Sequence, residues 1–166
     1  MTWFEAKDHC ESEGGKLVEI DSSEENTALV DEIKSKGYSN QNMNMNFWMG
    51  LTDLGNEGDW ILASNSLKPP YTNWDIATNQ PNNVDGNEHC ARIRTKPNSD
   101  SDTWSDLDCN STTAAYTPFP SMHALCEFDS PKESSSAEET TTEDSPQVIQ
   151  LNHSMAKIPD RSYGAN

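Results

Sequence analysis

Oxygen-bearing side chains are concentrated between Asn73 and Asp108, a stretch rich in Asn, Asp, Gln and Glu. Calcium in proteins takes about six to eight oxygen ligands from carboxylates, carbonyls and water. Gln80 and Asn82 flank Pro81, and a cis bond before this proline would turn both side-chain carbonyls toward one point. These residue types indicate a calcium-binding region.

Four cysteines form the second chemical feature, and they are Cys10, Cys90, Cys109 and Cys126. Four cysteines permit three pairings, and the sequence alone does not choose among them. Three of them have a histidine nearby, so a zinc site is the alternative to disulfides. Structural zinc sites use paired cysteines such as C-x₂-C, and no such pair occurs here. The pattern therefore favours two disulfides over zinc.

Two helices are predicted before the oxygen-rich stretch between Asn73 and Asp108. Thr2 and Glu5 form a capping-box pattern for a helix that ends near Ser12. Ser22 opens a second helix that ends at Gly37, and the expected inward side chains are Ala28, Leu29, Val30 and Ile33.

The strands are predicted after the helices. Segments 47–51, 59–62, 90–93, 104–107 and 123–128 are compact and apolar enough for short strands. Residues 63–87 lie between them without clear periodicity, and such a long irregular stretch is usually functional or disordered. Helices followed by strands indicate an α+β domain. Trp3, Trp48, Trp60, Trp74 and Trp104 are expected to pack in its core.

Composition changes near Asp129. All five tryptophans and all four cysteines precede it. The remainder, 129–166, is acidic and rich in Ser and Thr, and it lacks the apolar surface needed to offset the entropy of ordering. We therefore expect a folded domain at 1–128 and a disordered tail at 129–166.

Charge excludes one class of partner. The formal net charge is −17, which repels nucleic acid and anionic membrane surfaces. No apolar run approaches the ~20 residues that cross a bilayer, so membrane insertion is not expected.

The sequence also has no Ser-His-Asp signature, phosphate loop or metal-hydrolase motif, so an enzyme is not expected.

Residues 1–128 resemble the C-type lectin-like domain family. Trp3-Phe4-Glu5-Ala6-Lys7-x-x-Cys10 looks like the family's first helix, and Phe47-Trp48-Met49-Gly50-Leu51 looks like its central strand. Gln80-Pro81-Asn82, Glu88, Cys90 and Trp104-Ser105-Asp106 occupy the places of its ligand motifs. The resemblance implies disulfides Cys10–Cys126 and Cys90–Cys109, and a cis bond before Pro81.

The resemblance also implies a ligand site. Calcium would be held by Gln80, Asn82, Glu88 and Asp106, and the same side chains would hydrogen-bond two vicinal sugar hydroxyls. Ser105 stands where the family usually has an asparagine ligand, so it is expected to reach calcium poorly. Asp53, Glu57 and Asn83 are candidates for an auxiliary calcium, together with Glu88.

Two features weaken the expected calcium site and leave the sugar open. Glu88 and Asp106 are its only two carboxylates, and calcium affinity follows ligand charge. We therefore expect weak binding. The Gln-Pro-Asn triplet mixes a residue of the family's mannose-type motif with one of its galactose-type motif, so either sugar class remains open. Tyr71 and Tyr116 are candidates for stacking against a sugar.

The start of the chain lacks features that the family usually has. A secretory leader and the family's N-terminal strand are both absent before the first helix. We expect a secreted protein whose N-terminus is truncated here, with the last strand lacking one neighbour. Sequons at Asn110 and Asn152 agree with an extracellular location.

Two functions remain in competition. The first is calcium-dependent glycan binding, including innate recognition of microbial or host glycans. The second is a calcium-independent protein-binding module on the same fold. In both cases the tail would act as a spacer, and its Ser/Thr content is typical of an O-glycosylated stalk.

Overall fold

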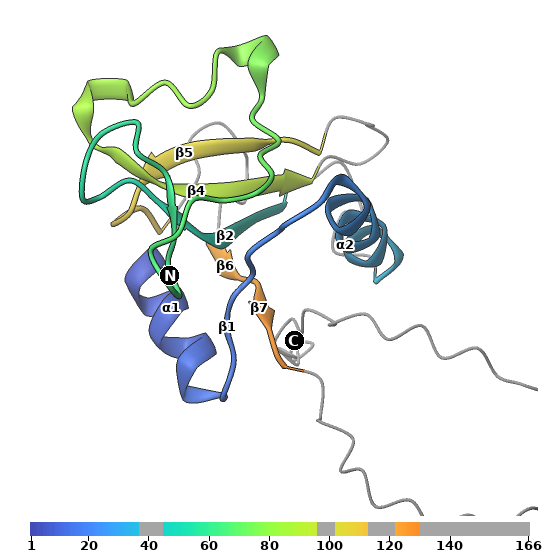
Figure 1. Ribbon diagram of the computed structural model, residues 1–166. Coiled ribbons are helices and arrows are strands. Elements are labelled where there is room, and N and C mark those ends of the chain that lie inside the picture. The colour runs from blue at the N-terminus through green and yellow to red at the C-terminus, as the bar shows by residue number, and fades with distance from the viewer. Residues whose placement is uncertain (37–44, 96–101, 113–121, 130–166) are drawn as a thin grey trace, which may run out of the picture.

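The computed structural model describes residues 1–36, 45–95, 102–112 and 122–129 (Figure 1). The two α-helices are α1 (Trp3–Ser12) and α2 (Ser23–Ser35), and two 3₁₀ turns follow, η1 (Ile76–Thr78) and η2 (Val84–Gly86). The strands are β1 (Lys16–Leu17), β2 (Met45–Thr52), β3 (Ile61–Leu62), β4 (Glu88–Thr95), β5 (Trp104–Asp108), β6 (Met122–Ala124) and β7 (Cys126–Glu127). The predicted α+β class is confirmed, while residues 130–166 of the expected tail lie outside the described residues.

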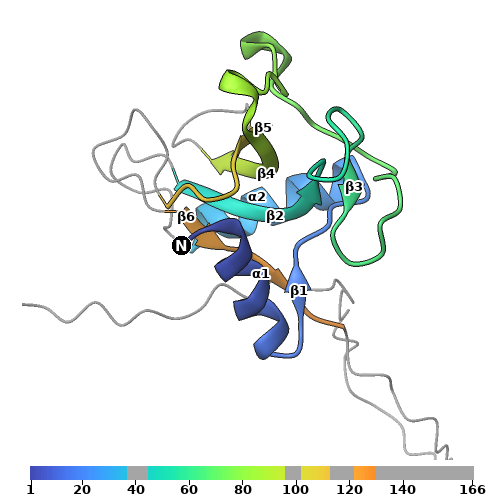
Figure 2. The ribbon, with the colours of Figure 1, turned by 90° about the vertical axis from the view of Figure 1, so that its left-hand side faces the viewer.

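The main sheet is built around β2 and β4. Its order is β3-β2-β4-β5 with antiparallel neighbours, and β6 adds to β2 in parallel. Figures 1 and 2 show α1 below this sheet and the part of the chain with the two 3₁₀ turns, just before β4, above it. The β3-β2-β4-β5 part of the sheet is therefore antiparallel, and β6 is the one strand that joins it in parallel among the described residues.

Alternation along β2 divides the core in two. Phe47, Met49 and Leu51 join the cluster that contains Val30 and Ile33 of α2. Trp48, which points to the opposite face, joins a second cluster with Trp3, Ala6 and Cys10 of α1. Because successive strand side chains point to opposite faces, one strand packs against both helices.

The helix caps form as predicted, but the buried face of α2 differs. Thr2 and Glu5 make a complete capping box, and Ser22 Oγ accepts the N–H of Glu25 at 3.2 Å. The buried positions of α2 are Asn26, Val30 and Ile33, while Ala28 is exposed. The expectation for Ala28 was wrong because Asn26 takes the inward position, where its Oδ1 accepts the Trp104 indole N–H at 2.9 Å.

The expected last strand at 123–128 is two short strands. β6 pairs with β2, whereas β7 pairs with β1. Between them Leu125 is fully buried, and its carbonyl accepts the N–H of Val18 at 2.8 Å. The chain therefore leaves one sheet and joins the other at this residue, so each short strand has a single strand partner among the described residues.

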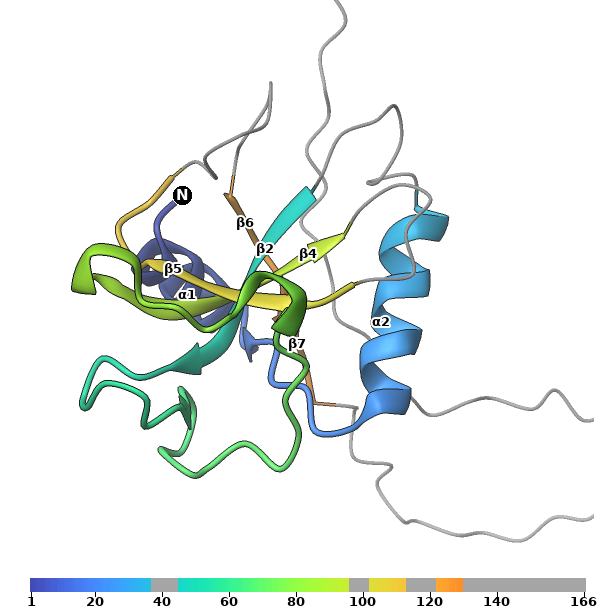
Figure 3. The same cartoon turned by 90° about the horizontal axis from the view of Figure 1, so that it is seen from above.

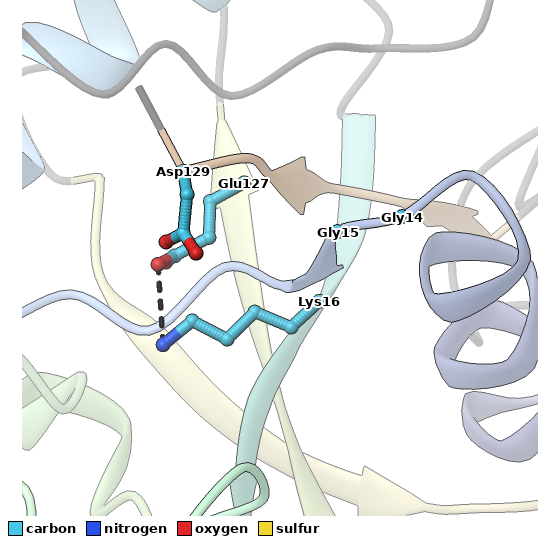
Figure 4. Close-up of a pocket in the computed structure, with 5 residues that line it drawn as sticks. All are labelled: Gly14, Gly15, Lys16, Glu127 and Asp129. Atoms are coloured by element: carbon cyan, nitrogen blue, oxygen red, sulfur yellow. Dashed lines mark ion pairs between the residues drawn. The ribbon is translucent and has the colours of Figure 1, made fainter. Parts of the chain in front are cut away.

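An ion pair supports the β1–β7 sheet. Lys16 Nζ lies 3.2 Å from Glu127 Oε1 (Figure 4). Glu127 Oε2 accepts the N–H of Glu19 at 2.8 Å. Gly15 allows the two strands to approach, because a Cβ at this position would lie 2.4 Å from the Glu127 carbonyl oxygen.

Two disulfides complete the domain. Cys10–Cys126 joins α1 to β7, and Cys90–Cys109 joins β4 to the turn after β5. These are the pairs implied by the resemblance. No cysteine is free, so the zinc alternative based on cysteine ligands fails. Each disulfide is expected to add about 2–4 kcal/mol to the free energy of unfolding.

Candidate functional site

The long segment between β3 and β4 lies above β4 and β5 (Figure 3). It is anchored by main-chain bonds, with Trp104 N–H donating to the Asn73 carbonyl at 2.8 Å and Asp75 N–H to the Trp104 carbonyl at 2.9 Å. Trp74 packs between Trp60 and Trp104, with ring centroids 4.7 and 6.0 Å away. The segment is therefore fixed near its middle by a tryptophan cluster, and Trp74 packs as predicted.

Asp106 of β5 holds the last third of this segment. Its Oδ2 accepts the main-chain N–H groups of Asn82 at 2.9 Å and Asn83 at 2.7 Å. Its own N–H donates to Gln80 Oε1 at 3.2 Å. The Gln80–Pro81 bond is cis, as the resemblance implies. One buried carboxylate thus folds the Gln-Pro-Asn motif onto the sheet.

The second oxygen of Asp106 is unusual. Asp106 is only 2% exposed, and its Oδ1 is buried without a hydrogen-bond partner among the described residues. A buried carboxylate oxygen is costly unless a donor or a cation meets it. Its position beside Glu88 gives it the surroundings of a cation ligand.

Glu88 supplies a second carboxylate beside Asp106. Burial raises the pKa of Glu88, and the negative charge of Asp106 raises it further, while the Val84 N–H and the charge of Arg92 act the other way. Its Oε2 accepts that N–H at 3.2 Å. A carboxylate whose ionisation is opposed by burial and by a neighbouring negative charge suits a divalent cation.

Arg92 is a half-buried cation in this region, and the sequence analysis missed it. Burial and neighbouring Arg94 lower its pKa to about 10. It donates to Ser105 Oγ at 2.8 Å and to Asn46 Oδ1 at 3.1 Å. Its signal in the sequence is a charged residue between the strand residues Ala91 and Ile93.

The structure separates Ser105 from the other expected ligands. Ser105 is paired with Arg92 in the β4–β5 register, and Asp106 with Ala91. Neighbouring side chains of β5 point to opposite faces, so the Ser105 hydroxyl lies with Arg92. Gln80, Glu88 and Asp106 come together, while Asn82 contributes its main-chain N–H and has an exposed side chain.

The three auxiliary residues form a neighbouring group with His89. Asp53 Oδ1 lies 3.0 Å and Glu57 Oε2 lies 3.4 Å from His89 Nδ1. Asn83 connects this group to Glu88, because its Nδ2 donates to Glu57 Oε2 at 2.5 Å and its Oδ1 accepts the Glu88 N–H at 3.0 Å. The sequence analysis did not name His89 among the ligands of this group.

The remaining site candidates lie elsewhere. Tyr71 packs edge-on against Trp104, with ring centroids 5.6 Å apart, and is half-buried. Tyr116 and Asn152 lie outside the described residues. Asn110 is exposed on the turn after β5, where its N–H donates to Asp108 Oδ1 at 2.9 Å.

Comparison with known proteins identifies the domain. The family model described as Lectin C-type domain matches residues 1–116. The chain belongs to the C-type lectin domain family. A perlucin-like protein from Mytilus galloprovincialis is 38% identical to this C-type lectin domain over 114 residues, which cover 69% of this chain and 67% of the relative.

Solved C-type lectin structures agree with this assignment. The lectin CEL-I from Cucumaria echinata is 28% identical to this chain, with a TM-score of 0.53. The match covers 66% of this chain and 76% of the CEL-I chain. The cow carbohydrate-recognition domain of CD23, solved in the presence of GlcNAc2Man3 oligosaccharide, is 29% identical to this chain, with a TM-score of 0.51. The match covers 67% of this chain and 73% of the CD23 chain.

Membership settles the broad class of activity. C-type lectin domains are binding proteins, and this chain is accordingly a binding protein and not an enzyme. None of the helices in the described parts has the length and apolar character needed to cross a bilayer.

Proposed function

We propose that this C-type lectin domain binds glycans through a calcium ion held by Gln80, Asn82, Glu88 and Asp106. One observation carries the proposal, which is the buried and unpaired Oδ1 of Asp106. Glu88 lies close enough for the two charges to interact. Amide oxygens and carboxylates are the donors that calcium prefers, so the residues present fit this ion.

The chain's own residues prepare such a site. Asp106 Oδ2 fixes the main chain at Asn82 and Asn83, so its other oxygen is held in place. Gln80 is oriented by its bond to the Asp106 N–H. Calcium, when bound, would supply coordination positions for two vicinal sugar hydroxyls. The exposed side chain of Asn82 would then be free to hydrogen-bond one of them.

The proposed ligands are mannose-type or galactose-type glycans. Gln80 and Asn82 each match one of the two family motifs, so the triplet favours neither class. The cow CD23 structure was solved in the presence of a mannose-containing oligosaccharide. That result belongs to CD23, and it supports testing mannose-type sugars first.

We propose weak calcium binding. Glu88 and Asp106 are the two carboxylates of the group, and Ser105 Oγ is engaged by Arg92. Calcium affinity falls as ligand charge falls, and extracellular modules bind with dissociation constants of about 10⁻⁴–10⁻³ M. We expect the weak end of this range.

A calcium titration of the oxidised protein tests the proposal. Tryptophan fluorescence is a suitable signal because Trp74 and Trp104 pack beneath the segment that Asp106 anchors. Glu88→Gln is expected to abolish the saturable change. Asp85→Asn is the matched control, because it removes an exposed acidic group of the same segment. Equal titrations for the two variants would contradict the proposal.

The second candidate is a calcium-independent protein-binding module. The bond from Arg92 to Ser105 favours it, because it occupies a position where the family usually supplies a calcium ligand. Binding to a partner that persists in excess chelator, with no calcium signal in the titration, would select this function.

We also propose an extracellular setting. Two disulfides persist in oxidising compartments, and exposed Asn110 is accessible for N-glycosylation. Asn152 and the Ser/Thr-rich residues 129–166 would carry further glycans and act as a spacer. Mass spectrometry of the secreted protein before and after glycosidase treatment tests these assignments.

A further inference from the structure

We propose that Asp53, Glu57 and His89 form a second metal site that prefers Zn²⁺ and similar transition ions to calcium. The group lies beside the proposed calcium ligands but shares no side chain with them. Its ligand atoms all lie within 4.8 Å of one another. The proposal stands whether or not the first site binds calcium.

Three different parts of the fold bring these side chains together. Asp53 follows the end of β2, Glu57 lies in the turn toward β3, and His89 belongs to β4. The Asp53 N–H donates to the His89 carbonyl at 3.2 Å, and Thr52 Oγ donates to the same carbonyl at 2.7 Å. Main-chain bonds between β2 and β4 therefore fix the distance between the aspartate and the imidazole.

The Asp53 carboxylate is held in place before any metal arrives. Its side chain is fully buried, and its Oδ2 accepts the N–H of Gly58 at 2.7 Å. Its Oδ1 is thereby directed toward His89 Nδ1, 3.0 Å away. Outer hydrogen bonds that orient a ligand in this way are typical of metal sites.

The donor set suits zinc better than calcium. Calcium takes six to eight oxygen ligands, whereas this group offers two carboxylates and one imidazole nitrogen. Asn83 directs its Nδ2 toward Glu57 and uses its Oδ1 for the Glu88 N–H, so its amide oxygen is turned away. Three protein ligands plus water are the usual set of an open zinc site.

Charge also favours a cation here. In the described part of the chain, the ion pairs of Asp53 and Glu57 are both with His89. Two carboxylates thus share one imidazole. A divalent ion would meet all three groups at once, since carboxylate oxygens and an imidazole nitrogen are metal ligands.

Cobalt and zinc titrations of the full, oxidised, metal-free chain test the proposal. One equivalent of Co²⁺ is expected to give visible absorption bands, and Zn²⁺ is expected to displace it. Glu57→Gln removes a largely exposed ligand and should weaken Zn²⁺ binding by about tenfold or more without disturbing the core. His89→Asp should lose the same affinity and gain affinity for Ca²⁺.

Matched controls separate this site from other metal contacts. His9→Asn removes a half-buried histidine of α1 and should leave Zn²⁺ affinity unchanged. Glu88→Gln should likewise retain Zn²⁺ binding. The proposal is overturned if no saturable binding occurs up to ~1 mM Zn²⁺, a concentration at which even weak extracellular calcium modules are occupied by their own ion. It is also overturned if Glu57→Gln and His89→Asp bind Zn²⁺ as well as the unmodified chain.

Discussion

Asp106 Oδ2 accepts the N–H of Asn83 at 2.7 Å, across 23 positions of the sequence. With the bond from Asn82, this contact joins β5 to the last third of the long segment between β3 and β4. Hydrogen bonds to a charged group contribute roughly 1.5–3 kcal/mol to stability. The same carboxylate therefore shapes the segment and presents its second oxygen to the candidate ligand site.

Replacing Asp106 by alanine should destabilise the metal-free domain by about 1.5–3 kcal/mol, because two main-chain donors lose a charged acceptor. Glu88→Gln is the comparison, since it removes the neighbouring charge and retains an acceptor for Val84. It should leave the free energy of unfolding unchanged or raise it. Urea unfolding in EDTA measures both variants, and equal losses would argue against this role of Asp106.

Calcium should raise the melting temperature of the oxidised domain. A ligand that binds only the folded state stabilises it by about 1.4 kcal/mol at ten times its dissociation constant. The shift should be small at 1 mM and clear near 10 mM, as expected for a weak extracellular site. Magnesium at the same concentration provides the control, and an equal shift with both ions would point to nonspecific screening.

Stability and calcium affinity should depend on pH in opposite ways through Glu88. Its pKa is raised in the folded state, so the folded protein holds this proton more tightly than the unfolded chain. Metal-free stability should therefore fall as the pH rises from about 4.5 through the raised pKa. Calcium affinity should rise over the same window, because the carboxylate must ionise.

The comparison of unmodified protein with Glu88→Gln isolates this effect from other acidic groups. Chemical unfolding would be measured at about pH 4 to 7, a range that begins near the ordinary pKa of a glutamate. The free energy of unfolding of Glu88→Gln should exceed that of the unmodified protein by an amount that grows with pH. A difference that stays constant across this range would show that Glu88 titrates with an ordinary pKa.

Asn26 is expected to be a stability determinant despite being polar. Its Oδ1 accepts the Trp104 indole N–H in the core. Asn26→Ala leaves that N–H buried and unpaired, which should cost about 1–3 kcal/mol. Thr27→Ala changes the exposed neighbour on the same helix and should cost much less. Thermal unfolding compares them, and similar losses would mean that the indole finds another partner.

Local patterns predicted the helices well because caps are encoded within a few residues. Thr2 and Glu5 define the start of α1, and the alternation around Trp48 defines β2. Asn26 was missed because its partner Trp104 is 78 positions away. Burial of a polar residue depends on such a distant partner, which helical periodicity does not reveal.

The candidate site was predicted in composition but not in arrangement. The resemblance placed Gln80, Glu88 and Asp106 in one group, and they lie together. It could not show that Arg92 engages Ser105, because this contact depends on the β4–β5 register. Nor did it show His89 between Asp53 and Glu57, since that geometry depends on the bonds between β2 and β4.

Glycan retention in the presence and absence of calcium tests the central claim most directly. The oxidised chain would be applied to mannose- and galactose-coated resins in ~10 mM calcium, which exceeds the dissociation constant expected of a weak site. We predict retention on at least one resin, elution by EDTA, and no retention of Glu88→Gln, while Asp85→Asn is retained. Retention that survives EDTA, or equal retention of both variants, would contradict a calcium-bridged sugar site.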